Sequence, residues 1–286
     1  MLIVRSQHRH GNLLPAAYNA ISSVPKELCR HQEHGKRHPK SAYGTSLRLL
    51  SEQWIKFFGE LKRLRTEYLW QTKDDHYSIV VNEYRELLHR IHEHLDACNS
   101  VIRSLCNPHD AKASVFDVQF LNQAKPPGWK NFQAVTKKYN DDHIGLLVNT
   151  LKHSQGELCG VYFTSETEFR PGYFLKDILP NGLLGPSARL HNGGNTAFSF
   201  ARDMLIHLWY FYRIGEELAN TVATIVRVKH SHELAMTPTS STNSRWNDVL
   251  ELCAEVRPEF FPDELKKPYP VIQYNHRDQE VSARVK

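Results

Sequence analysis

The sequence has few cysteines and no pattern that would pair them. Its 286 residues include five cysteines, an odd number, and no Cys-x-x-Cys motif occurs. Disulfide frameworks and zinc ribbons are built on such pairs, so neither is indicated. We therefore expect reduced thiols that pack like small apolar side chains.

The chain also lacks an apolar run long enough to cross a membrane. The best candidate, residues 203–226, carries Arg213, Glu216 and Glu217, whereas a spanning helix needs roughly 20 apolar residues with few charges. The first residues, MLIVRSQHRHGNLL, have too short an apolar core and too many basic residues after it for a secretory signal. The sequence predicts a cytoplasmic protein without membrane contact.

Enough apolar surface is present to form a core. Hydrophobic residues make up 41% of the chain, which suits a globular protein of this length. The formal net charge is +5, and 17 histidines add a reserve of positive charge at acidic pH. This balance permits an acidic partner such as RNA but does not require one.

Helical periodicity dominates the chain. Apolar residues recur three and four positions apart in residues 46–70 and 77–106, which predicts two long helices joined as an antiparallel hairpin. A third helix is expected from Asp141 or Asp142 to about residue 156. A fourth is expected to run to about residue 228, capped by Thr196 or Ser199.

One segment between these helices changes its period. GVYFTSETEF and YFLKDIL are rich in β-branched and aromatic residues, and Arg170-Pro171-Gly172-Tyr173 separates them. This pattern predicts a β-hairpin near residues 157–179.

Three regions follow from these patterns. Residues 1–45 form a basic, His-rich N-terminal arm, residues 46–235 a helical domain with the hairpin inside it, and residues 236–286 a linker, a short helix and a polar C-terminal tail. The predicted fold class is mainly α, a helical bundle with a small β-hairpin insertion.

The stretch RDMLIH places polar residues in an otherwise apolar and aromatic helix. Asp203 and His207 are four positions apart and share a helix face, so Asp203 can orient the imidazole, while the long side chain of Arg202 can still reach the same cleft. The stretch VNTLKH repeats the spacing with Asn149 and His153. If the two faces meet, they bring together a buried polar cluster of Asn149, Lys152, His153, Arg202, Asp203 and His207.

RDMLIH resembles the signature of the HEPN superfamily (higher eukaryote and prokaryote nucleotide-binding domains): an Arg, a polar residue, and a His four to six positions after the Arg. The resemblance implies an all-helical bundle that dimerises through its motif helices, and a metal-independent endoribonuclease of a toxin or antiviral defence system. His207 would then move the proton of the RNA 2′-hydroxyl, Arg202 would hold the scissile phosphate, and Asp203 would orient the ring. VNTLKH resembles a weaker version of the motif in which Val148 replaces the Arg. No cofactor or metal is expected at this site.

Other stretches admit different sites. HRIHEH places His89 and His92 on one helix face and could seed a metal site, and His109-Asp110 is similar to the metal-binding dipeptide of HD phosphohydrolases. The loop HNGGNT, residues 191–196, could present backbone N–H groups to a phosphate. The basic arm could bind an RNA backbone.

A non-enzymatic alternative is a helical protein that dimerises or binds a partner protein through the aromatic stripe Trp209, Tyr210, Phe211 and Tyr212. The accessibility of His207 separates the two hypotheses. Catalysis needs an imidazole that is open to a cleft with Arg202 beside it, whereas a binding protein does not.

Overall fold

The structure is a computed structural model of the chain. It describes residues 2–5, 13–69, 75–112, 116–153, 156–165, 168–179, 181–191, 197–235, 245–255, 259–264, 268–275 and 280–285. It is mainly helical with small antiparallel sheets, as the sequence predicts. Within these ranges, none of the helices is long and apolar enough to cross a membrane.

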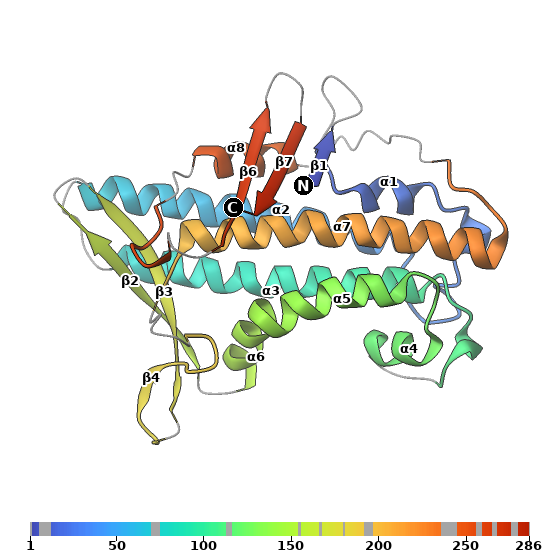
Figure 1. Ribbon diagram of the computed structural model, residues 1–286, viewed down its shortest axis with the longest axis horizontal. Coiled ribbons are helices and arrows are strands. Elements are labelled where there is room, and N and C mark those ends of the chain that lie inside the picture. The colour runs from blue at the N-terminus through green and yellow to red at the C-terminus, as the bar shows by residue number, and fades with distance from the viewer. Residues whose placement is uncertain are drawn as a thin grey trace.

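Three long helices lie side by side and form the centre of the molecule (Figure 1). They are α2 (Pro39–Leu69), α3 (Asp75–Arg103) and α7 (Phe200–His230). The predicted hairpin of two helices is present as α2 and α3, although α2 begins earlier than expected because Pro39 suits the first turn of a helix. Their apolar faces make one continuous core, which includes Leu50, Trp54, Phe57, Leu87, Leu88, Leu208 and Val222.

Shorter helices cover this core. They are α1 (Ala16–Ser22), α4 (Asp117–Ala124), α5 (Trp129–Tyr139), α6 (Gly145–His153) and α8 (Trp246–Glu255), with single 3-10 turns η1 (Lys26–Leu28) and η2 (Pro108–Asp110). A π-helical turn, η3 (Asn140–Ile144), joins α5 directly to α6. The expected caps Asp141 and Asp142 therefore lie inside this turn, and the helix they were expected to start begins with α5.

The predicted hairpin is strands β2 (Glu157–Thr164) and β3 (Phe169–Ile178), extended by the short strands β4 (Leu184–Pro186) and β5 (Phe198–Ser199). The expected turn is wrong: Arg170, Pro171 and Gly172 lie inside β3, opposite Phe163, Tyr162 and Val161 of β2. The β3–β4 end of the sheet projects away from the bundle (Figure 1).

The N-terminal region, predicted as a basic arm, contains a helix that packs on the bundle. Helix α1 packs against α7, where Leu13, Ala17 and Ile21 are buried. Tyr212 of α7 fixes the start of this segment, because its hydroxyl donates to the Leu13 carbonyl at 2.8 Å. Apolar residues too sparse to predict a helix by themselves are thus ordered by tertiary packing.

The C-terminal region also differs from the polar tail that was expected. Strands β6 (Pro270–Asn275) and β7 (Glu280–Val285) pair with each other, and β7 pairs with β1 (Leu2–Arg5). The two ends of the chain thus meet in a three-stranded antiparallel sheet in the order β1-β7-β6. Long-range strand pairing of this kind leaves little local signal in a sequence.

Candidate functional site: a buried histidine, aspartate and tyrosine cluster

The RDMLIH stretch lies in the first two turns of α7. Ser199 is the N-cap of this helix, and its side chain accepts a hydrogen bond from the Arg202 backbone N–H at 3.2 Å. Of the two predicted caps, Ser199 is therefore the one used, while Thr196 lies outside the described residues. The cap fixes where the helix begins and hence which face Asp203 and His207 occupy.

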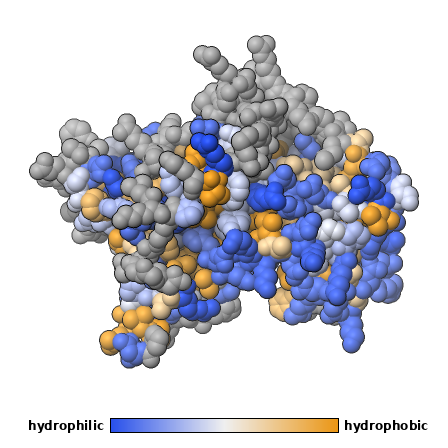
Figure 2. All heavy atoms as spheres, viewed as in Figure 1, coloured by the Kyte–Doolittle hydropathy of each residue, from blue (hydrophilic) through white to orange (hydrophobic). Residues whose placement is uncertain are grey.

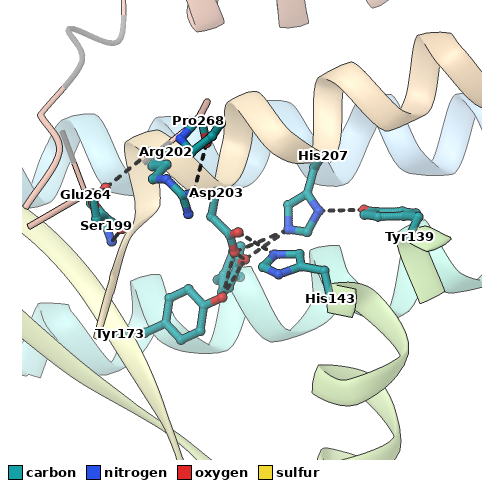
Figure 3. Close-up of polar contacts among 10 residues, drawn as sticks. Tyr139, His143, Tyr173, Ser199, Arg202, Asp203, His207, Glu264 and Pro268 are labelled. Atoms are coloured by element: carbon teal, nitrogen blue, oxygen red, sulfur yellow. Dashed lines mark hydrogen bonds and ion pairs between the residues drawn. The ribbon is translucent and has the colours of Figure 1, made fainter. Parts of the chain in front are cut away.

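Asp203 and His207 face the inside of the bundle (Figure 3). Each is only 1% exposed, and His207 Nε2 lies 3.5 Å from Asp203 Oδ2. The predicted pairing of these two side chains is present. Their surroundings, however, are protein side chains from four other elements: α3, α5, η3 and β3.

Three tyrosine hydroxyls complete the polar shell of this pair. Tyr84 of α3 donates to Asp203 Oδ2 and also lies 3.0 Å from His207 Nε2. Tyr173 of β3 donates to the same carboxylate oxygen at 2.6 Å. Tyr139 of α5 lies 2.5 Å from His207 Nδ1, so both imidazole nitrogens have a partner in the interior.

A second histidine reaches the carboxylate from the π-helical turn. His143 is 8% exposed, and its Nε2 forms an ion pair with Asp203 Oδ1. The π-turn is made possible by Gly145, because a Cβ at that position would overlap the carbonyl oxygen of Asn140. We call His143, Asp203, His207, Tyr84, Tyr139 and Tyr173 the buried cluster.

The charge state of the cluster follows from its contacts. Burial favours the neutral acid, but the electrostatic interactions and hydrogen bonds with His143 and His207 outweigh it and hold the pKa of Asp203 well below its usual value. Burial lowers the pKa of His207, and Asp203 opposes this effect. Burial and the Asp203 charge together raise the pKa of Tyr84 and Tyr173 well above the usual value. Asp203 is therefore the ionised acceptor, and the phenols remain protonated donors.

Arg202 does not join this cluster. Its side chain points away from His207 toward the C-terminal segment (Figure 3), where a terminal guanidinium nitrogen donates to the Pro268 carbonyl at 3.2 Å. Glu264 lies nearby and accepts from the Ser199 backbone and hydroxyl at 3.0 and 2.6 Å. Adjacent positions on a helix differ in direction by about 100°, so Arg202 and Asp203 lie on different faces of α7.

The second predicted group, from VNTLKH, lies elsewhere. Asn149 and Lys152 are exposed on α6, and the side chain of His153 lies outside the described residues. Lys152 lies near α3. Burial lowers the pKa of His89 on that helix, and the positive charge of Lys152 lowers it further. The structure therefore does not bring Asn149 and Lys152 together with Asp203 and His207.

The other candidate sites serve structural contacts in the described residues. Asp96 lies 3.7 Å from His92, and Asp110 pairs with Lys229 at 2.5 Å. His191 is buried and accepts the Leu175 backbone N–H at 2.9 Å, while the rest of its loop, 192–196, lies outside the described residues.

The aromatic stripe of α7 is largely internal. Phe211 packs on Trp246, with ring centroids 4.0 Å apart, and Tyr212 accepts a hydrogen bond from the Trp246 indole at 2.8 Å. Tyr210 stacks on Tyr139 at 4.3 Å. Phe211 and Tyr212 therefore hold α7 to α8, and Tyr210 holds it to α5, while Trp209 and Tyr210 are only partly buried.

Sequence reasoning found Asp203 and His207 but missed His143 and the three tyrosines, because these residues lie on other elements, far along the chain from the RDMLIH stretch. Together, His143, Asp203 and His207 place three ligand atoms within 4.8 Å of one another, the one arrangement in the described residues that could hold a metal ion. No protein-family model, curated protein or solved structure matches the chain, so the geometry alone carries the functional argument.

Proposed function

We propose that this is a non-catalytic helical protein that binds a second copy of itself through the projecting end of its β2–β3–β4 sheet. The endoribonuclease hypothesis requires His207 to reach an RNA hydroxyl with Arg202 beside it. His207 is instead enclosed by Tyr84 and Tyr139, and Arg202 contacts Pro268. Within the part of the chain that the structure describes, Arg202 and His207 therefore do not line one site together, which favours a non-catalytic role.

The observation that carries the proposal is an apolar patch at the sheet end. Ile178, Leu183 and Leu184 are 54%, 64% and 60% exposed, and we call them the tip patch. Figure 2 shows hydrophobic atoms gathered where this end of the sheet projects from the bundle. Exposed apolar side chains that gather on a protruding element mark an interaction surface more often than single exposed residues do.

A second copy suits this patch for two reasons. Two identical tips related by a two-fold axis bury the same apolar side chains on both chains, which needs no complementary partner surface. Lys176 and Asp177, the neighbours of the patch along β3, carry opposite charges, so the same edge does not repel its own copy.

Sedimentation velocity over a range of concentrations tests the proposal. We expect the wild-type chain to form a dimer, and we expect Leu183→Asp/Leu184→Asp to weaken it at least about a hundredfold, because burying each leucine contributes about 1–2 kcal/mol per chain. Val228→Asp is the matched control, since Val228 is 59% exposed on α7. A wild-type chain that stays monomeric, or a double variant that dimerises like the wild type, would contradict the proposal.

The same preparations test the endoribonuclease hypothesis. We expect total cellular RNA to remain intact in EDTA with both the wild type and Arg202→Ala. Cleavage that resists EDTA and disappears in Arg202→Ala would show instead that a rearranged or dimeric form assembles the HEPN-like site.

A further inference from the structure

We propose that the buried cluster is a structural zinc site, with His143 Nε2, a carboxylate oxygen of Asp203 and His207 Nε2 as its ligands. The proposal goes beyond dimer formation and does not depend on it, since the cluster and the tip patch share no residue. It begins from the convergence of these three ligand atoms within 4.8 Å of one another.

The ligand chemistry selects a first-row transition metal. Two imidazoles and one carboxylate are common ligands of Zn²⁺, whereas Mg²⁺ and Ca²⁺ prefer sites made only of oxygen. The hydroxyl of Tyr84 contacts Asp203 and lies 3.0 Å from His207 Nε2. It offers a fourth oxygen, which would complete a four-coordinate site.

The outer contacts also fit a metal site. Histidine ligands usually have their second ring nitrogen hydrogen-bonded, which fixes the ring and leaves the first nitrogen free for the ion. Tyr139, at 2.5 Å from Nδ1 of His207, makes this contact and leaves Nε2 directed at Asp203. Tyr173 holds the carboxylate from another side at 2.6 Å.

Burial decides the class of site. Catalytic zinc sites keep a coordination position open to water or substrate, whereas structural sites are closed. Asp203 and His207 are each 1% exposed and His143 is 8% exposed, so the ion would be held in the interior. It would join α7 to the π-turn between α5 and α6.

The depth of the site determines how the experiment is run. An ion cannot reach ligands this deeply buried without local opening, so the full-length chain is unfolded in guanidinium with EDTA. It is then freed of EDTA and refolded near neutral pH with Co²⁺, Zn²⁺ or a chelator. Cobalt replaces zinc in such sites, and its visible absorption reports tetrahedral coordination.

We expect about one Co²⁺ per wild-type chain, and at least tenfold less in His143→Gln and in His207→Gln. His94→Gln is the matched control, because His94 is equally buried but pairs with Ser46 Oγ at 2.9 Å, outside the cluster. Circular dichroism checks that each variant folds. Metal bound equally by the wild type and the two cluster variants would overturn the proposal, as would a wild-type chain that binds none.

A second measurement needs only the wild type and so does not depend on variants that fold. The chain refolded with Zn²⁺ should unfold at a higher temperature than the chain refolded with chelator, because an ion that binds only the folded state stabilises it. Equal unfolding temperatures would contradict a structural zinc site. The cluster would then be a hydrogen-bonded network whose charge is balanced by protons alone.

Discussion

The substitution Asp203→Asn tests whether one buried carboxylate organises the interior around α7. Asparagine keeps the shape of the side chain and one carbonyl oxygen but removes the charge. It also places an NH₂ group, a donor, among the hydroxyl of Tyr84 and the imidazoles of His143 and His207. Two donors then face each other where a donor previously faced an anion.

The magnitude follows from what is lost. Hydrogen bonds to a charged acceptor contribute roughly 1.5–3 kcal/mol each, against roughly 0.5–1.5 kcal/mol for neutral pairs. Asp203 accepts two such bonds, from Tyr84 and Tyr173, and forms an ion pair with His143. Removing one partner of a buried ion pair costs about 3–5 kcal/mol. We therefore expect the free energy of unfolding to fall by about 3–5 kcal/mol.

Guanidinium unfolding followed by circular dichroism at pH 7 in EDTA measures this loss without any contribution from a metal. Asp142→Asn is the control, since Asp142 pairs with Lys138 at 2.7 Å and both side chains are more than half exposed. Surface pairs of this kind contribute about 0–1 kcal/mol. If Asp203→Asn cost no more than Asp142→Asn, the interior would not depend on the carboxylate and the reasoning would be wrong.

Three further predictions concern the same interior. Burial lowers the pKa of His94 from 6.5 to about 4, so below about pH 6.5 the unfolded chain takes up a proton that the folded chain does not. The free energy of unfolding should therefore fall between pH 7 and pH 4, and His94→Gln should lose about 3 kcal/mol less than the wild type over this range. Tyr139→Phe should cost about 1–3 kcal/mol in chemical unfolding, because it leaves the buried Nδ1 of His207 without a partner; an unchanged midpoint would show that water replaces the hydroxyl. Gly145→Ala should lower the unfolding temperature, because its Cβ would overlap the Asn140 carbonyl oxygen; a stable variant would mean that the π-turn relaxes to a regular helix.

The parts of the fold that the sequence predicts are those with a local period. The spacing of apolar residues identified α2, α3 and α7, and the β-branched and aromatic residues identified β2 and β3. Pairing between distant segments had no such signal. Strands β1 and β7 are at opposite ends of the chain, and α1 is too short to be stable without the surface of α7.

The candidate site divides in the same way. A spacing of four correctly predicts that Asp203 and His207 share a helix face. A spacing of five places Arg202 on a different helix face from His207. The sequence nevertheless predicts that the long side chain of Arg202 can reach the same cleft. In the structure, the Arg202 guanidinium instead donates to the Pro268 carbonyl, a contact 66 positions away that no local pattern predicts.

The π-turn explains how His143 enters the interior, and the sequence did contain a signal for it. Tyr139, His143, Leu147 and Leu151 are all buried and follow one another at intervals of four. In a regular α-helix each interval of four drifts by about 40° around the axis, so three intervals would carry Leu151 well away from the face of Tyr139. A wider turn at residues 140–144 absorbs part of this drift and keeps all four on the inner face. The wide turn therefore keeps Leu147 and Leu151 on the inner face that Tyr139 and His143 already share, and this face supplies both polar side chains to a cluster whose carboxylate comes from α7.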